Sequence, residues 1–151
     1  MGAGHPKPAM RKSFLTFFLA AGAACSSSRL STEPIILSQS EAADSVRVRV
    51  GQVLIVEGVR IRFTGVESDS RCPQDVVCVW AGDAIANVSV ELNCECRAAA
   101  IQLPLHLNTE PRSGTAYGYR VELRGLEPAT HSESEIKPEA YRAFVRVLRV
   151  E

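Results

Sequence analysis

Three short segments of the chain alternate between apolar and polar residues, and this pattern constrains the fold more than any other feature. The segments are VRVRV at 46–50, VRIRFT at 59–64 and YRVELR at 119–124. A period of two residues directs one set of side chains into a core and the other into solvent, as in a half-buried β-strand. Further strands are expected at 53–56, 84–92, 98–107 and 141–150. Because no segment has a convincing amphipathic helical pattern, the sequence predicts an all-β fold, an antiparallel β-sandwich or small barrel of about seven to eight strands.

Glycine and proline residues mark the connections between these strands. Glu57-Gly58 predicts a hairpin turn. Pro104 predicts an edge strand or a bulge, because proline has no N–H to donate to a central ladder. Residues 108–118 and 125–137 are rich in polar and turn-forming residues and are expected to be loops, and Pro138 begins an expected brief helical turn.

One stretch, DSRCPQDVVCVWAG at 69–82, holds two of the five cysteines and the only tryptophan. Cys72 and Cys78 enclose a short loop, and a disulfide across it would remove unfolded-state entropy worth about 2 kcal/mol. The apolar run at 76–80 predicts the end of a strand that is pinned into the core. In this interpretation Trp80 is the core anchor beside the disulfide.

Two interpretations of this stretch remain open. In the functional one, the rigid loop is a contact surface made by Asp69, Arg71, Asp75 and Trp80. In the structural one, the disulfide is a staple and the polar residues shape a turn. Arg71 has two candidate ion-pair partners, Asp69 and Asp75.

The same stretch resembles the signature of a group of small bacterial secreted proteins and lipoproteins, in which D-S-R-C-P is followed after a few residues by C-V/I-W-A-G. The resemblance covers residues 46–150 and implies a disulfide-stapled β-domain, but it carries no function with it. Cys94 and Cys96 are an addition to the pattern of this group.

The N-terminal residues are typical of an export signal. Residues 1–24 combine a basic start with a short apolar segment that ends in small residues, and Met10 is a possible true start. Cys25 follows directly and resembles the lipid-attachment cysteine of bacterial lipoproteins; ordinary cleavage near Ala24 is the alternative. We therefore expect a signal peptide at 1–24, a lipidated cysteine and tether at 25–44, and a β-domain at 45–151. By resemblance, Ser26 after the cysteine favours an outer-membrane lipoprotein of the cell envelope that faces the periplasm or the surface.

With Cys25 set aside, four cysteines remain, an even number for an oxidising compartment. Proximity favours the pairs Cys72–Cys78 and Cys94–Cys96. Alternatives for Cys94 and Cys96 are a bridge to another loop, free thiols, or a metal or redox site that could include His106. No complete set of zinc ligands at typical spacing is recognisable, so no metal or cofactor is predicted.

The charges and the histidines exclude several functions. From Cys25 onward the chain has a net charge of −3, so it lacks the excess of basic residues that is typical of a nucleic-acid-binding domain. His106 and His131 are both expected to face solvent. No nucleophile motif accompanies them, so no catalytic residue is predicted. Eight arginines lie at outward strand positions and could form a cationic face if their strands share a sheet: Arg47, Arg49, Arg60, Arg62, Arg120, Arg124, Arg142 and Arg146. Outward Glu91 and Glu122 could neutralise this face.

The favoured function is an exported, lipid-anchored, non-catalytic binding or envelope-structural module. Its membrane contact would be the N-terminal lipid, and its partner an envelope protein or an anionic glycan. One alternative is a metal- or redox-active envelope protein that uses the hairpin of Cys94 and Cys96. Another is an inhibitor of secreted hydrolases, since rigid loops on β-scaffolds suit that function.

Overall fold

The computed structural model describes residues 1–2, 33–36, 44–96 and 98–150. The chain divides into two compact units, Met1–Leu30 and Ser31–Glu151, and the description below concerns the second. The predicted signal peptide beyond Gly2, the predicted lipidation site Cys25 and most of the predicted tether lie outside the described residues. Among the described residues, no helix is long and apolar enough to cross a membrane.

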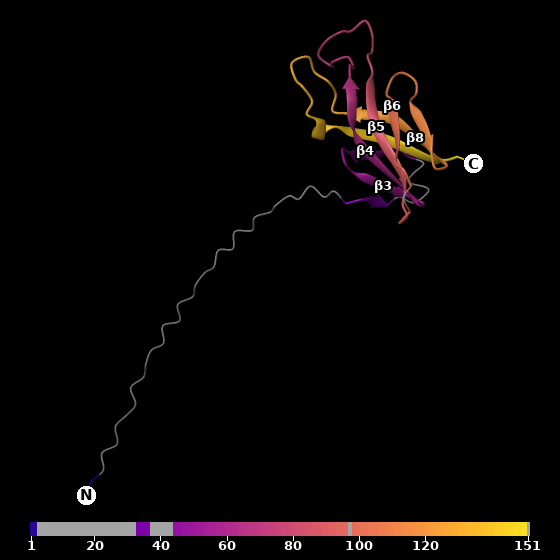
Figure 1. Cartoon of the computed structure of the whole chain (residues 1–151). Coiled ribbons are helices and arrows are strands. Elements are labelled where there is room, and N and C mark those ends of the chain that lie inside the picture. Colours follow the sequence, from indigo (N-terminus) through magenta and orange to yellow (C-terminus); the bar gives the residue numbers. More distant parts are fainter. Residues whose placement is uncertain (3–32, 37–43, 97, 151) are drawn as a thin grey trace. The chain divides into compact units, whose positions relative to one another are not determined.

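Two β-sheets form the domain, which confirms the predicted β-sandwich (Figure 1). The first sheet contains, in spatial order, β1 (Ile35–Ile36), β3 (Val53–Val56), β4 (Val59–Asp69), β5 (Ala84–Leu92) and β6 (Ile101–His106). The second contains β2 (Val46–Arg49), β9 (Arg142–Arg149), β8 (Tyr119–Glu127) and β7 (Ser113–Ala116). Neighbouring strands are antiparallel except that β1 runs parallel to β3. A single 3₁₀ turn, η1 (Pro138–Ala140), precedes β9 within the described chain, where the sequence predicts a helical turn.

The core lies between the sheets and consists of the inward set of each alternating strand. Phe63, Ile61 and Val59 of β4 are fully buried, and they meet the inward side chains of β8 and β9, including Leu123 and Val145. Their charged neighbours in the sequence point outward, because successive side chains of a strand alternate between its faces. The apolar and polar periods at 46–50, 59–64 and 119–124 therefore report the two faces correctly.

Two turn predictions are confirmed in detail. Glu57 and Gly58 join β3 to β4 and have φ angles of 40° and 88°, the pair of positive values that a type I′ hairpin requires. Pro104 lies in β6, which is the edge strand of the first sheet, so its missing N–H breaks no central ladder.

The predicted strand boundaries were wrong in several places. Residues 113–116 form β7 inside the segment expected to be a loop, because Ser-Gly-Thr-Ala has no apolar alternation that would reveal a strand. Leu103 of β6 packs over Gly114, which has no Cβ to block it, and this contact links the two sheets. β4 and β8 also run on to Asp69 and Glu127, with irregular register that the sequence did not indicate. Residues 76–80 were expected to end a strand and lie outside every strand.

Candidate functional site

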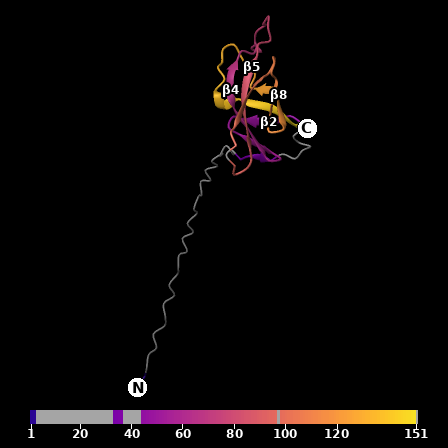
Figure 2. The same ribbon diagram turned by 45° about the vertical axis from the view of Figure 1, so that its right-hand side comes forward.

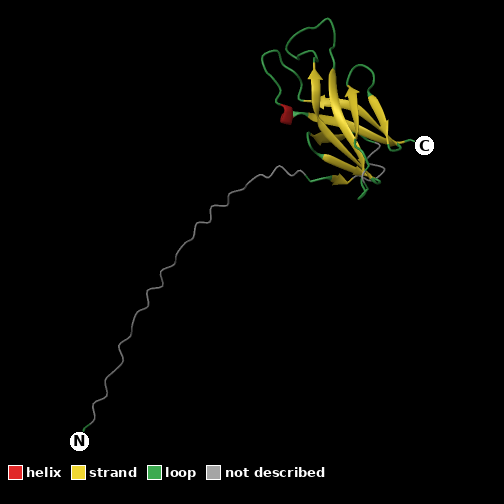
Figure 3. Ribbon diagram, viewed as in Figure 1, coloured by secondary structure: helices red, strands yellow, loops and turns green. Residues whose placement is uncertain are grey.

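Residues 70–83 connect the end of β4 to the start of β5 and project as a loop from one end of the sandwich (Figure 3). The base of this loop is closed by backbone hydrogen bonds, from Ser70 N–H to Asp83 O (2.7 Å) and from Cys72 N–H to Ala81 O (3.0 Å). The predicted disulfide between Cys72 and Cys78 is present, with an S–S distance of 2.09 Å. These three links hold the loop closed along its length.

Gly82 completes the base because its backbone conformation and surroundings exclude a larger residue. Its φ of 67° lies in the left-handed region, and a Cβ there would overlap the carbonyl oxygen of Ser70. A glycine tolerates this conformation without steric cost, whereas other residues rarely do. The close approach of the two chain segments at the neck of the loop therefore depends on this glycine.

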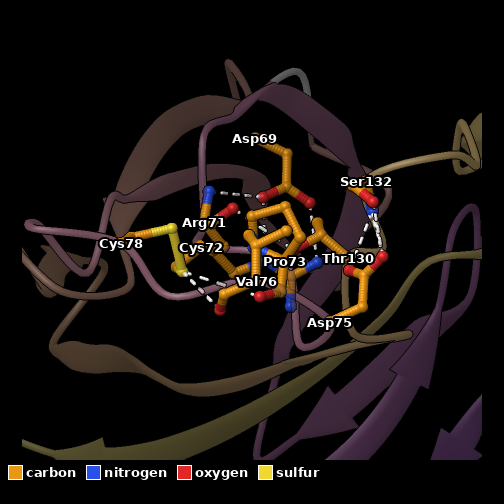
Figure 4. The surroundings of a disulfide bond; sticks show 9 residues. All are labelled: Asp69, Arg71, Cys72, Pro73, Asp75, Val76, Cys78, Thr130 and Ser132. Carbon is orange, nitrogen blue, oxygen red and sulfur yellow. Dashed lines mark hydrogen bonds and ion pairs between the residues drawn. A yellow bond between two sulfur atoms is a disulfide. The ribbon is translucent and has the colours of Figure 1, made fainter.

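Arg71, drawn beside Asp69 in Figure 4, fastens the loop to the domain. Its guanidinium group donates two hydrogen bonds to the Asp69 carboxylate, at 2.8 and 2.6 Å. It also donates to the carbonyl oxygens of Leu126 (2.7 Å) and Pro128 (2.8 Å), which lie at the end of β8 and just beyond it. The side chains of Arg71 and Asp69 are only 11% and 9% exposed. A planar, bidentate guanidinium at a nearly buried position joins loop and sheet in a defined orientation.

A second set of contacts joins the loop to residues 128–137, the segment after β8. Gln74 N–H donates to the carbonyl of Thr130 (2.9 Å), and the Thr130 hydroxyl donates to the carbonyl of Arg71 (3.2 Å). The Asp75 carboxylate accepts hydrogen bonds from the backbone N–H of Ser132 (2.9 Å) and from its hydroxyl, as Figure 4 shows. The two loops therefore form one hydrogen-bonded unit.

The ionisation of this unit follows from its contacts. Burial alone would raise the pKa of Asp69, but the hydrogen bonds and charge of Arg71 outweigh it and hold that pKa below its ordinary value. Burial first, and then its hydrogen bond to Asp69 (3.0 Å), raises the pKa of Tyr141 to about 12. Near neutral pH the carboxylate is thus charged and the phenol neutral, which is the state that makes every hydrogen bond described here.

The apolar residues of the loop lie on its outer side. Val77, Val79 and Trp80 are 101%, 88% and 82% exposed, and Val76 is also exposed. The expectation that Trp80 anchors the core was therefore wrong. The core is filled by side chains from the two sheets, and the loop is joined to the end of β8 by the polar contacts of Arg71.

The structure thus divides the four predicted contact residues into two nearly buried residues and two exposed ones. Asp69 and Arg71 lie beneath the loop and are engaged in holding it, with little surface for a partner. Asp75 and Trp80 are exposed on the loop itself. The sequence missed Val77 and Val79 as surface residues, because an apolar β-branched run is equally typical of a buried strand.

Asp83 organises a neighbouring polar cluster that the sequence did not reveal. Its carboxylate lies 2.6 Å from His106 Nδ1 and accepts a hydrogen bond from the Thr109 hydroxyl (2.7 Å) and from the backbone N–H groups of Leu107 and Asn108. Burial would raise the pKa of Asp83, but these hydrogen bonds outweigh it and hold that pKa far below its ordinary value. His106 was expected to face solvent, yet its side chain is only 24% exposed because it packs on this carboxylate. His131, by contrast, is exposed as expected.

The geometry around His106 differs from that of a hydrolytic triad. Both the Asp83 carboxylate and the Thr109 hydroxyl (2.9 Å) lie against the same ring nitrogen, Nδ1. A triad needs its carboxylate and its nucleophile on opposite ring nitrogens, so that the imidazole can take the nucleophile's proton. The cluster is arranged to hold the start of β5 against the end of β6.

The other predicted pair, Cys94–Cys96, is also a disulfide, located after the end of β5. His106 pairs with Ile85 at the opposite end of β5, roughly 20 Å away at about 3.3 Å per residue. His106 is therefore not part of a site with Cys94 and Cys96. Among the described residues, no group of three or more potential metal-binding side chains is clustered.

Comparison with models of protein families, with curated proteins and with solved structures found no significant match.

Proposed function

We propose that this protein is an exported, lipid-anchored binding module that docks on a partner protein through the exposed tip of the 70–83 loop. The observation that carries the proposal is the exposure of Val77, Val79 and Trp80 on a loop that is otherwise fixed in place. Contiguous exposed apolar residues on a soluble domain mark interaction sites. Tryptophan is also the residue type most enriched among those that dominate binding energy.

The fastening of the loop supports the same function. The disulfide, the Arg71 hydrogen bonds and the contacts to residues 128–137 fix its backbone before any partner binds. A fixed loop loses little conformational entropy on binding, which increases affinity for a given contact area.

The position and charge of the tip favour a protein partner over a lipid bilayer. The chain enters the domain at β1, which pairs with β3, and β3 in turn pairs with the first residues of β4. The loop follows the last residues of β4. The intervening nine residues of β4 span roughly 30 Å, so the tip lies at the end of the domain away from the entry of the tether. Carboxylates flank the tip, Asp75 in the loop and Glu133 and Glu135 beside it, and anionic headgroups would repel them.

Export and lipid anchoring enter this proposal through the N-terminal sequence. The two disulfides agree with an oxidising compartment, where such small domains are commonly stapled. An anchor on the N-terminal side would leave the loop free to reach outward from the membrane into the envelope.

The tryptophan provides its own test because Trp80 is the only one in the chain. The purified protein should show the red-shifted emission of a hydrated indole, and soluble quenchers should reach it freely. Fractions of envelope proteins are then titrated against it, and a partner should shift the emission to the blue and protect it from quenching. Val79→Ser should weaken the interaction, whereas Ile101→Ser, which changes an exposed apolar residue on β6, should leave it intact.

Two outcomes would overturn the proposal. One is equal affinity of the Val79 and Ile101 variants for the partner. The other is a blue shift with lipid vesicles and with no protein fraction. Secreted hydrolases are included among the fractions, and loss of their activity on binding would identify the module as an inhibitor.

A further inference from the structure

We infer that the outer face of the second sheet is a binding site for an anionic polysaccharide, separate from the loop and independent of its function. The face is formed by the outward positions of β2, β9 and β8, which lie side by side in that order (Figure 2). Of the arginines that the sequence suggested for a cationic face, the structure brings six onto this sheet and places Arg60 and Arg62 on the other. The six are Arg47, Arg49, Arg120, Arg124, Arg142 and Arg146.

The register of the strands places these charges close together. Arg47 lies opposite Phe144, and Arg49 lies opposite Arg142. On the other side of β9, the bulge in β8 places Arg124 and Gly125 opposite the same Phe144. Neighbouring strands are about 4.8 Å apart, so Arg47 of β2 and Arg124 of β8 occupy positions on either side of the half-buried Phe144. The guanidinium group of Arg142 donates to the backbone carbonyls of residues 139–141 at the edge of the face.

The acidic residues on this face do not cancel its charge. Two glutamates lie among the outward residues of β8, and each faces an arginine: Glu127 contacts Arg47 (2.6 Å) and Glu122 contacts Arg146 (3.8 Å). The exposed side chains of Arg49, Arg120 and Arg124 have no carboxylate partner among the described residues. The chain from residue 25 onward carries a net charge of −3, so the positive charge is concentrated on one face of a slightly acidic protein.

The chemistry of the face indicates the class of ligand. Guanidinium groups bind carboxylate, sulfate and phosphate oxygens through paired N–H donors, and several in a row suit a polymer with repeated charges. The Phe144 ring packs over Gly125, with 3.3 Å between its Cδ2 and the place of a glycine Cβ, and its outer surface could contact the C–H groups of a sugar.

A lipid surface fits this face less well. Peripheral proteins that bind bilayers combine basic residues with large apolar side chains that enter the interface. None of the exposed large apolar residues in the described chain lies on β2, β8 or β9. The face therefore offers charge and hydrogen bonds without a means of insertion, as expected for an extended anionic chain in water.

The test uses the full exported chain and a polyuronate, alginate, as the probe, with neutral dextran for comparison. Retention on immobilised alginate should be strong at low salt and fall as salt screens the charges. The variant R120Q/R124Q removes two unpaired charges from the face. The control R60Q/R62Q removes two charges from the outer face of the first sheet, where Arg60 is paired with Glu91 (3.4 Å). The first should lower affinity roughly 5- to 30-fold, and the second less than twofold.

Each outcome of this experiment decides the matter. Selective loss in R120Q/R124Q, with retention of its far-UV circular dichroism spectrum, would support the site. Equal losses in both variants would show that only net charge matters and would overturn it. Absence of binding to alginate at low salt would overturn it as well, and so would binding to vesicles of phosphatidylglycerol without binding to alginate. Because the loop residues are unchanged in both variants, none of these results bears on the loop proposal.

Discussion

Replacing Arg71 by alanine tests the structural basis of the loop most directly. The substitution removes four hydrogen bonds from one guanidinium group, two to Asp69 and one each to the carbonyls of Leu126 and Pro128. Hydrogen bonds to charged groups contribute about 1.5–3 kcal/mol each, and loss of one partner of a buried ion pair costs about 3–5 kcal/mol. Tyr141 still donates to Asp69, and water can reach part of the vacated site. We therefore expect Arg71→Ala to lower the free energy of unfolding by about 3 kcal/mol.

Urea denaturation followed by far-UV circular dichroism at neutral pH measures this loss. The matched control is Arg47→Ala, which removes an ion pair with the same 2.6 Å separation but with side chains 59% and 46% exposed. Such a surface pair contributes up to about 1 kcal/mol. Arg71→Lys keeps the charge but loses the planar fork, and an intermediate loss is expected.

A double-mutant cycle separates the ion pair from the rest of the network. Adding Asp69→Asn to Arg71→Ala removes the carboxylate left without its partner, so the double variant should lose less than the sum of the single losses, by about 1–2 kcal/mol. If Arg71→Ala costs no more than Arg47→Ala, the network does not hold the loop and the argument for a pre-formed contact surface fails.

Four further predictions follow from the same contacts. Trp80→Ala should change the free energy of unfolding, measured by urea denaturation, by less than about 0.5 kcal/mol because the side chain is exposed. A loss of several kcal/mol would show that Trp80 is buried in the core. The double variant Cys72→Ser/Cys78→Ser should lose about 2 kcal/mol in the same assay, and no loss would show that the disulfide closes a loop already constrained when unfolded. The pKa of Asp83 is lower in the folded state than in the unfolded state, so its ionisation stabilises the fold. This stability is fully present above the unfolded pKa of about 4 and is lost as pH falls further. The Asp83→Asn variant should therefore lose less stability than the native chain on acidification below that pH. The pKa of Tyr141 is raised to about 12 in the folded state, so the neutral phenol adds stability that is fully present below a pH of about 10 and is lost as pH rises towards the folded pKa. Ultraviolet titration of the Tyr141→Phe variant should show one late-ionising phenol fewer than titration of the native chain. An unchanged titration would contradict the assignment.

The alternation of the strands was readable from the sequence because it is a local property. The inward residues of 46–50, 59–64 and 119–124 needed only the geometry of one strand to be placed. The structure buries them as predicted, except that Val46 and Val50 are partly buried against the core. The hairpin at Glu57-Gly58 and the edge position of Pro104 followed in the same way from backbone chemistry. Both disulfides join cysteines that are close in the sequence, so proximity sufficed to pair them.

The sites depend on contacts between distant parts of the chain, and only the tertiary structure decided these. Arg71 binds carbonyls 55 and 57 residues away, and Asp83 lies against a histidine 23 residues away. No local pattern specifies such partners, because the order of strands in the two sheets determines which loops meet at one end.

Two surface features were decided at the same level. An apolar run is equally compatible with a buried strand and with an exposed loop, and only the tertiary structure shows that Trp80 lies on the surface. The arginines likewise alternate outward in β2, β4, β8 and β9, but only the strand order shows that six of them share one face. The sequence by itself determined the faces of the strands and the staples, and the tertiary structure decided which faces and loops lie together, because sheet order is set by packing of the whole core.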